Sequence, residues 1–152
     1  MDDDRSVRES LARVLSQESY LVVPAADGQQ ALAIAASTEI DLVLLDLNLP
    51  GRDGWTIFER LTIENPLLPV IIITGRPSQL FPALASGVGA LVEKPLDFPK
   101  LFQTIQNLLE EPEEMRLARV AGQPAEFHYF PAQRVSKRWY QPHAPASNSA
   151  ER

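Results

Sequence analysis

Two short runs of consecutive apolar residues constrain the fold of this chain more than any other feature. The first reads DLVLLDL over 41–47, and the second reads LPVIIITG over 68–75. A strand with one face in water alternates apolar and polar side chains, whereas a strand with both faces covered is apolar on consecutive residues. The two runs therefore predict strands inside a sheet that carries helices on both faces.

Amphipathic segments lie between these runs and predict the covering helices. We expect Ser78 and Asp97 to cap two of them, with Pro82 and Pro99 tolerated in the first turns. The expected strands are 20–25, 41–47, 68–75 and 90–94, and the expected helices are 6–17, 28–37, 54–65, 78–87, 97–111 and 113–121. This order predicts an α/β parallel sheet, in which ligands bind at the carboxyl ends of the strands.

Composition narrows the class of protein. A length of 152 residues suits one domain with a tail. The chain has no cysteine, and no apolar run approaches the ~18 residues of a membrane span, so we expect a soluble cytoplasmic protein. The net charge is −6, and the acidic excess lies in residues 1–111. Nucleic acid is therefore not expected as a partner of this part, because binding phosphates needs a basic surface.

Polar side chains of three chemistries follow the buried strands. Asp46, Thr74 and Lys94 each stand at the expected carboxyl end of a strand, and the acidic run DDD over 2–4 precedes the first helix. Carboxylates this close repel unless a hard cation such as Mg²⁺ neutralises them. A carboxylate can also attack a phosphoryl group while a metal, a hydroxyl and an ammonium stabilise the transferring oxygens. The constellation therefore predicts aspartyl phosphorylation.

Each of these residues also has a structural explanation when it is taken alone. Asp46 can open a turn, Thr74 suits a strand, and Lys94 can be a solvated surface charge. The run over 2–4 can favour the dipole of the following helix, and we expect Asp4 to act only in this way. The joint pattern, and no single residue, favours the phosphoryl chemistry.

The same residues carry a resemblance to a known family. The motifs DDD, LLDLNLPGRDGW, IIITG and EKP occur in the order and spacing of the receiver domains of two-component response regulators, similar to the chemotaxis receiver. The resemblance implies a flavodoxin-like doubly wound parallel sheet, with 1–111 as the receiver domain.

For the site, the resemblance implies that Asp46 is the phosphoacceptor. Asp2 and Asp3 would form the acidic pair that binds Mg²⁺, Asp3 directly and Asp2 through water. Asp46 itself and the backbone carbonyl of Asn48 would complete the metal ligands. Thr74 would donate its hydroxyl to the phosphoryl group in the active state.

Further positions follow from the same resemblance. Lys94 would pair with a phosphoryl oxygen, and its bond to Pro95 would be cis, which only an X-Pro bond adopts at low cost. Asn48 and Arg76 occupy positions that tune how long the phosphoryl group survives. At the position where the family has an aromatic switch residue this chain has Leu91, so it departs from the family pattern there.

The start of the chain also departs from the family, which has an apolar strand directly before the acidic pair where this chain has only Met1. Loss of such a strand of ~5 residues forfeits on the order of 5 to 10 kcal/mol, comparable to the stability of a whole domain. Our hypothesis is that the gene product starts upstream or that its start was misassigned. A strand exchanged between copies or donated by a partner is the less favoured explanation.

Residues 112–152 are expected to form an extension. After the helix at 113–121 it partly packs on the domain and ends disordered, because it is rich in Pro, Ser, Ala and Asn. It is too short for an effector domain with its own core. The alternative is a docking segment for a partner protein, or a weak nucleic-acid contact through arginines and aromatics. His128 and His143 are too far apart in it for a metal or catalytic site.

Together these features predict a stand-alone signalling phosphoacceptor and not an enzyme, although one that catalyses its own phosphorylation and slow dephosphorylation. The donor would be a histidine kinase or histidine phosphotransfer protein, and the output would be contact with an unknown downstream protein. Phosphorylation would bias the surface of 78–86, 90–93 and 98–109. One alternative is a degenerate receiver that binds partners without phosphate. The other is a haloacid-dehalogenase-like phosphohydrolase, disfavoured because Asn48 stands where that family has an acid.

Overall fold

The chain folds around a parallel sheet. The computed structural model describes residues 1–49, 53–123 and 125–132. Within these ranges the strands, in spatial order, are β1 (Val43–Asp46), β2 (Val70–Thr74), β3 (Ala90–Glu93) and β4 (His128–Phe130). All three neighbouring pairs are parallel, so the row Leu45, Ile72, Leu91 and Tyr129 crosses the whole sheet.

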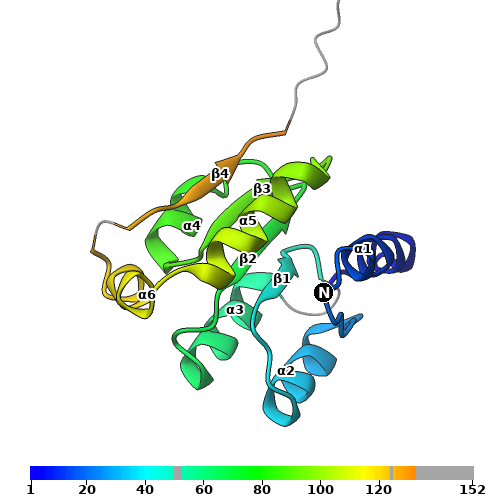
Figure 1. Ribbon diagram of the computed structural model, residues 1–152, viewed down its shortest axis with the longest axis horizontal. Helices are drawn as coiled ribbons and strands as arrows, with labels where there is room; N and C mark the ends of the chain where they lie inside the picture. Colours follow the sequence, from blue (N-terminus) through cyan, green and yellow to red (C-terminus); the bar gives the residue numbers. More distant parts are fainter. Residues whose placement is uncertain (50–52, 124, 133–152) are drawn as a thin grey trace, which may run out of the picture.

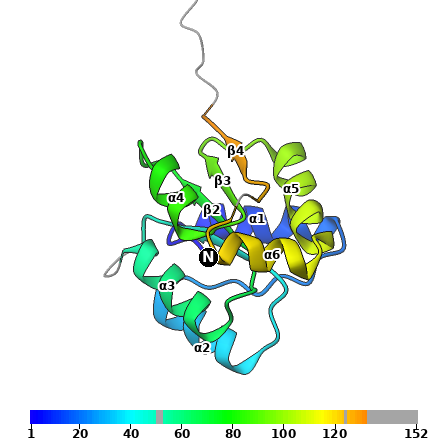
Figure 2. The same cartoon turned by 90° about the vertical axis from the view of Figure 1, so that its left-hand side faces the viewer.

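Helices cover both faces of this sheet (Figure 1). They are α1 (Arg5–Gln17), α2 (Gly28–Ser37), α3 (Gly54–Glu64), α4 (Leu80–Ser86), α5 (Phe98–Glu110) and α6 (Glu113–Val120). Residues of α3 and α4 are buried with one face of the strands, and residues of α1 and α5 with the other (Figure 2). No described helix has both the length and the apolar character needed to cross a bilayer.

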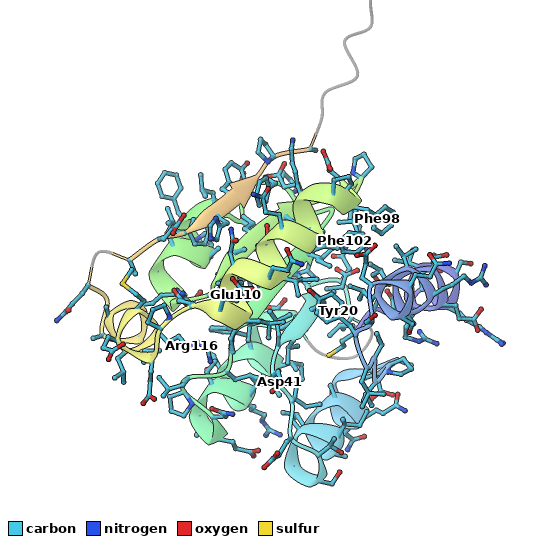
Figure 3. All side chains as sticks on the ribbon, viewed as in Figure 1. Tyr20, Asp41, Phe98, Phe102, Glu110 and Arg116 are labelled. Carbon is cyan, nitrogen blue, oxygen red and sulfur yellow. The ribbon has the colours of Figure 1, made fainter. Side chains whose placement is uncertain are left out.

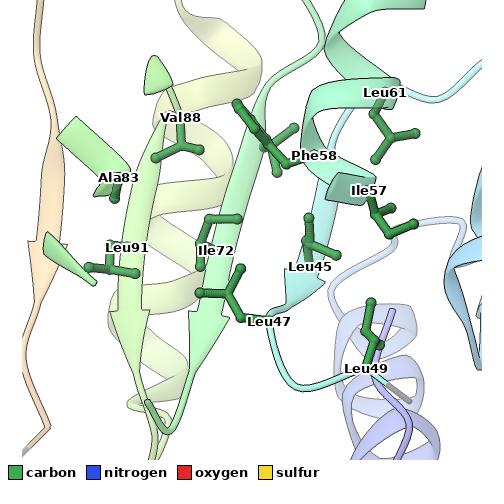
Figure 4. Close-up of a cluster of buried hydrophobic side chains, with 11 residues drawn as sticks. Leu45, Leu47, Leu49, Ile57, Phe58, Leu61, Ile72, Ala83, Val88 and Leu91 are labelled. Carbon is green, nitrogen blue, oxygen red and sulfur yellow. The ribbon is translucent and has the colours of Figure 1, made fainter. Parts of the chain in front are cut away.

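The two apolar runs supply both core layers. On one face Leu45, Ile72 and Leu91 are fully buried against α3 and α4 (Figure 4). On the opposite face Ile71 and Ile73 pack with the residues of α1 and α5. Successive strand residues point to opposite faces, so a strand buried on both sides has to be apolar throughout. The prediction of an α/β parallel sheet from these runs is confirmed.

Helix α5 closes its side of the sheet with aromatic side chains. Phe98 and Phe102 lie with their ring centroids 6.2 Å apart, and both pack in the same apolar cluster as Tyr20 (Figure 3). The expected cap of this helix is confirmed, because the Asp97 carboxylate accepts a hydrogen bond from the backbone N–H of Lys100. The cis bond between Lys94 and Pro95 is present.

The prediction that Ser78 caps α4 is wrong. Ser78 has a φ of 61°, in the left-handed region, whereas a capping residue has an extended backbone. Gln79 occupies the position before the helix and organises the turn with its side chain. Its amide donates to the carbonyl of Pro77 and its oxygen accepts from the indole N–H of Trp55. These contacts to α3 and to the turn outweigh local capping by Ser78.

The strand expected at 20–25 does not form. No described strand lies beside this segment, and the one backbone bond that links it to the sheet region runs from Asp2 N–H to the carbonyl of Ala25, at 3.3 Å. Leu21 is accordingly 96% exposed. Apolar, β-branched composition makes a strand only where a neighbouring strand can accept its hydrogen bonds.

Strand β1 is consequently an edge strand. On its outer side Met1 alone pairs with it among the described residues: the Met1 amino group donates to the Leu44 carbonyl at 2.8 Å, and the Met1 carbonyl accepts from the Asp46 N–H at 3.1 Å. A cavity of about 280 Å³ lies next to this edge. Its lining includes Leu11, Val22, Ile34, Leu42, Leu44 and Ile105.

The other edge of the sheet carries an element that the sequence did not predict. The expected helix at 113–121 is confirmed as α6, and after it the chain returns to pair β4 with β3. The extension was expected to pack partly on the domain, but not as a strand. The expectation of disorder at its end concerns 133–152 and lies outside the described residues.

Candidate functional site

The carboxyl ends of the strands bring the expected polar side chains together. Asp46 is the last residue of β1, Thr74 the last of β2, and Lys94 follows β3 directly. The parallel register brings Asp46 opposite Ile73 and Thr74 opposite Glu93, so the three ends lie at one rim of the sheet. The side chain of Asp46 is 2% exposed, and Thr74 is fully buried.

Lys94 connects this rim to the start of the chain. Its Nζ lies 2.6 Å from Oδ2 of Asp46 and 3.0 Å from Oδ2 of Asp2. Asp2 is also 2% exposed, although it belongs to the segment before α1. Asp4 caps that helix by accepting from the N–H groups of Ser6 and Val7, which is the structural role expected for it.

Burial and hydrogen bonds act in opposite directions on the pKa values of Lys94 and its neighbours. It lowers the pKa of the ammonium, but hydrogen bonds from Lys94 to Asp46 and Asp2 outweigh it, so the net pKa of Lys94 is raised and the group stays charged. Burial also raises the pKa of Asp2 in spite of the hydrogen bond from Lys94. The pKa of the Met1 amino group is lowered by burial to about 6, against the attraction of Asp2 and Asp46.

The acidic side chains fit a hard divalent cation. One carboxylate oxygen from each of Asp2, Asp3 and Asp46 can lie within 4.8 Å of the others, and Asp3 is exposed at the mouth of the cluster. Mg²⁺ prefers such oxygen ligands together with water and phosphate oxygens. Asn48, whose carbonyl is the remaining expected ligand, lies beside the cluster, since its N–H donates to Oδ1 of Asp46 at 2.8 Å.

Arg76 connects three further polar residues near the ends of the strands. The N–H of Arg76 donates to Oγ1 of Thr74 at 2.9 Å, and its guanidinium donates to Oδ1 of Asn48 at 2.5 Å and to Oδ1 of Asp53 at 2.8 Å. Sequence analysis singled out Asn48 and Arg76 but missed Asp53. Asp53 precedes α3 and reads as an ordinary cap, yet its carboxylate faces Arg76 and makes no capping bond.

The start of α3 packs unusually close to this rim. A Cβ atom on Gly54 would lie 2.6 Å from Cα of Leu47 and 2.9 Å from the carbonyl oxygen of Asp46. Only glycine permits this approach. Gly54 therefore sets the distance between α3 and the strand that carries Asp46.

The remaining expected positions lie apart from the site. Leu91, at the position of the aromatic switch residue, is fully buried in the core, and Tyr129 of β4 is its neighbour in register. His128 lies on β4 with its ring 3.9 Å from the Glu126 carboxylate, away from the acidic cluster. His143 lies outside the described residues.

Comparison with known proteins identifies the class of this chain. It belongs to the response regulator receiver domain family, which it matches over residues 1–106. The resemblance drawn from the motifs is thereby confirmed, and the chain is a receiver domain protein of two-component signalling. Helix α6 and strand β4 lie beyond the matched residues.

Individual relatives agree with this class. Response regulator MprA of Mycolicibacterium vanbaalenii is 37% identical over 111 residues, covering 72% of this chain and 48% of the relative. Transcriptional regulatory protein GlrR of Escherichia coli strain K12 is 34% identical over 113 residues, covering 73% of this chain and 26% of the relative. The chain thus spans about half or less of the length of these curated relatives.

Solved structures show the same fold. The receiver domain protein of Methanospirillum hungatei superposes with a TM-score of 0.70 at 30% identity, covering 74% of this chain and 91% of the other. Response regulator TrrA of Thermotoga maritima, solved in complex with Mg²⁺ and BeF, gives a TM-score of 0.66 at 26% identity, covering 70% and 93%. The flavodoxin-like receiver fold is confirmed.

Proposed function

We propose that Asp46 accepts a phosphoryl group from the phosphohistidine of a histidine kinase or histidine phosphotransfer protein. The observation that carries the proposal is the position of its carboxylate. It lies almost fully buried at a strand end, bound to the Lys94 ammonium and within reach of two further carboxylates. A carboxylate placed between a fixed cation and a metal-binding cluster suits nucleophilic attack on a phosphoryl group.

In the proposed step an oxygen of Asp46 forms a bond to phosphorus while the bond from phosphorus to the imidazole nitrogen of the donor breaks. The imidazole leaves with the electron pair of that bond. Mg²⁺ held by Asp2, Asp3, Asp46 and the carbonyl of Asn48 would neutralise charge on the phosphoryl oxygens. The carboxylate oxygen is itself the nucleophile in this step, so no proton has to be removed from a hydroxyl or a thiol.

Two side chains would stabilise the product. Lys94 would exchange its contact with Oδ2 of Asp46 for a phosphoryl oxygen, which keeps a positive charge beside the transferred group. Thr74 accepts from the Arg76 N–H, so its own hydroxyl proton is available to donate to the phosphoryl group. Because Thr74 ends β2 and Lys94 follows β3, these new contacts would link phosphorylation of Asp46 to the ends of both strands.

Arg76, Asn48 and Asp53 would determine how long the phosphoryl group survives. Their side chains form a hydrogen-bonded chain at the rim beside Asp46. Hydrolysis needs a water molecule to approach the phosphorus, and this chain of contacts limits the approach. Slow self-dephosphorylation follows from this arrangement.

The output would be contact with a downstream protein in the cytoplasm. The face that would change is formed by α4, β3 and α5, because Lys94 follows β3 directly. The acidic excess of residues 1–111 gives no basic surface for nucleic acid on this part of the chain. We place residues 112–152 outside the receiver domain as an extension of it.

A degenerate receiver that binds partners without phosphate is the second candidate. The observation that favours it is Leu91, which is fully buried and offers no aromatic ring to couple with Thr74. Such a protein would keep the fold and the binding surface without accepting a phosphoryl group.

Intact mass of the purified protein after incubation with acetyl phosphate and Mg²⁺ separates the two candidates. We expect a gain of one phosphoryl group that requires Mg²⁺ and is lost in Asp46→Asn. The matched control is Asp41→Asn, which removes an exposed carboxylate from the same segment and should label like the wild type. Absence of labelling in folded wild-type protein would overturn the phosphoacceptor function and favour the binding module.

A further inference from the structure

The segment after α5 forms a strap along the outer edge of β3. We call residues 113–132, as far as the structure describes them, the C-terminal strap; it comprises α6 and β4. Figure 2 shows β4 beside β3, with α4 and α5 on either side of the pair. Ala90 pairs with His128, and Val92 pairs with Phe130. The strap thus covers the strand edge that directly precedes Lys94.

The two ends of the strap are held differently. At α6, Nη2 of Arg116, labelled in Figure 3, donates to the carbonyls of Leu108 and Leu109 at the end of α5. Arg119 forms an ion pair with Glu111. These arginine contacts are largely buried, and they anchor α6. At β4 only three residues pair, and all of them are half-buried. The β4 end is therefore the part that can detach.

Glu93 holds the β4 end in place. Its Oε1 accepts from the Tyr129 hydroxyl and its Oε2 accepts from the backbone N–H of Ala132, both at 2.9 Å. These contacts use both oxygens of the carboxylate. The hydrogen bond from Tyr129 to Glu93 also raises the pKa of the phenol above its usual value. One carboxylate thus fastens two positions of the strap.

Glu93 is also the residue next to Lys94. In the same structure Lys94 bonds the unmodified carboxylates of Asp46 and Asp2 while Glu93 bonds the strap. Glu93 and Lys94 are consecutive residues, so a displacement of the backbone at this strand end moves the base of both side chains. The closed strap therefore belongs to the arrangement in which Lys94 still contacts unphosphorylated Asp46.

We propose that the C-terminal strap is a latch that opposes phosphorylation of Asp46 and is released by it. When Lys94 leaves Oδ2 of Asp46 for a phosphoryl oxygen, the strand end moves, and the two bonds of Glu93 to the strap weaken. Release uncovers the β3 edge between α4 and α5. Coupling between two sites is reciprocal, so a strap that loosens on phosphorylation must also restrain phosphorylation while it is closed. The latch rests on the proposed function of Asp46.

Hydrogen exchange read by mass spectrometry tests the latch. The full chain is compared with and without Mg²⁺ and beryllofluoride, which mimics an aspartyl phosphate. We expect exchange in 126–132 to rise about tenfold on addition, while α6 keeps its protection. Asp46→Asn should show no change. Fluorine NMR of the bound beryllofluoride reports independently whether the site is occupied.

A second experiment tests the opposite direction of the coupling, from the strap to the site. It uses variants that weaken the strap at residues that hold neither the metal nor the phosphoryl group. Tyr129→Phe removes one bond to Glu93, and Glu93→Ala removes both. Each should raise the affinity of the folded chain for beryllofluoride in the presence of Mg²⁺, Glu93→Ala by about fivefold. Glu126→Ala, which removes an exposed carboxylate from the same segment, is the matched control and should bind beryllofluoride like the wild type.

The outcomes separate the latch from the underlying function. Occupancy by beryllofluoride with unchanged exchange in 126–132 would overturn the latch and leave the phosphoacceptor function intact. Unchanged affinities for beryllofluoride in both strap variants would do the same. Absence of both labelling and beryllofluoride binding would overturn the phosphoacceptor function and the latch with it.

Discussion

The two outer strands of the sheet, β1 and β4, are held in different ways. At the edge of β1, Met1 contributes two backbone hydrogen bonds, and a cavity of about 280 Å³ lies alongside. At the edge of β3, β4 pairs over three residues and Glu93 adds two further bonds. Asp2 is thus attached through the backbone bonds of Met1 and through Lys94, whereas the opposite edge is held by a paired strand. We expect the β1 edge to open first under stress.

The largest effect should come from the core that both edges share. Ile72→Ala should lower the free energy of unfolding by about 3 to 4 kcal/mol, because Ile72 is fully buried on the second strand of the sheet. Urea unfolding measures this loss, and hydrogen exchange should accelerate equally at 1–4 and 126–132. Ile63→Ala, on the exposed face of α3, is the control and should cost little. Unequal acceleration at the two edges would show that they unfold independently of the centre.

Removal of the Lys94 cation should affect the β1 edge selectively. Lys94→Met leaves Asp2 and Asp46 close together without their shared cation, and should cost about 2 kcal/mol in Mg²⁺-free buffer, less than a fully buried pair because Lys94 is 27% exposed. Exchange should increase over 1–15 more than over 126–132. Lys100→Met, which removes an exposed lysine, serves as the control. A larger change at 126–132 would contradict the comparison.

Mg²⁺ should stabilise the edge that carries the acidic residues. At ten times its Kd, a cation that binds only the folded chain adds about 1.4 kcal/mol. Calorimetry should show a higher Tm with Mg²⁺, and exchange should slow at 1–4 with little change at 126–132 in the absence of a phosphodonor. Asp3→Asn should abolish the shift, whereas Asp4→Asn, at a residue that caps α1, should retain it. Stabilisation that survives in Asp3→Asn would place the cation elsewhere.

The smallest effect should appear at the β3 edge. Tyr129→Phe removes one hydrogen bond at a half-buried position and should lower the free energy of unfolding by about 1 kcal/mol. Exchange should rise in 126–132 and stay unchanged at 1–4. Tyr20→Phe, which alters a tyrosine on the other side of the molecule, provides the comparison. Equal changes at both edges would mean that the loss is global.

The sequence predicted the centre of the sheet well and its edges poorly. The runs around Leu45 and Ile72 determine their own burial, because they are apolar on every residue. Asp46, Thr74 and Lys94 could be placed at one rim, since parallel strands end on the same side. An edge strand depends on a neighbour that is distant in the chain. Composition alone therefore could not show that 20–25 lacks a partner or that 128–130 finds one.

The contacts around the site show the same limit. Asp2 and Asp3 were recognisable from their position before the first helix, but the bond of Asp2 to Lys94 joins residues 92 positions apart. Glu93 reads as one more strand-end charge, and its role emerges only with β4 beside it. Ser78 was misassigned as a cap because its neighbours, and not its own preference, determine the turn.

Strand β4 has a practical consequence for anyone who trims this protein to the boundaries of its family. A fragment that ends near residue 106 or 111 would lose the strand that shields β3 and would leave a row of bare N–H and C=O groups in solution. Such rows pair readily with another chain. Dimers or aggregates of the fragment would then result from the truncation. Partner screens made with the fragment would detect binding to an exposed strand edge that the longer chain covers.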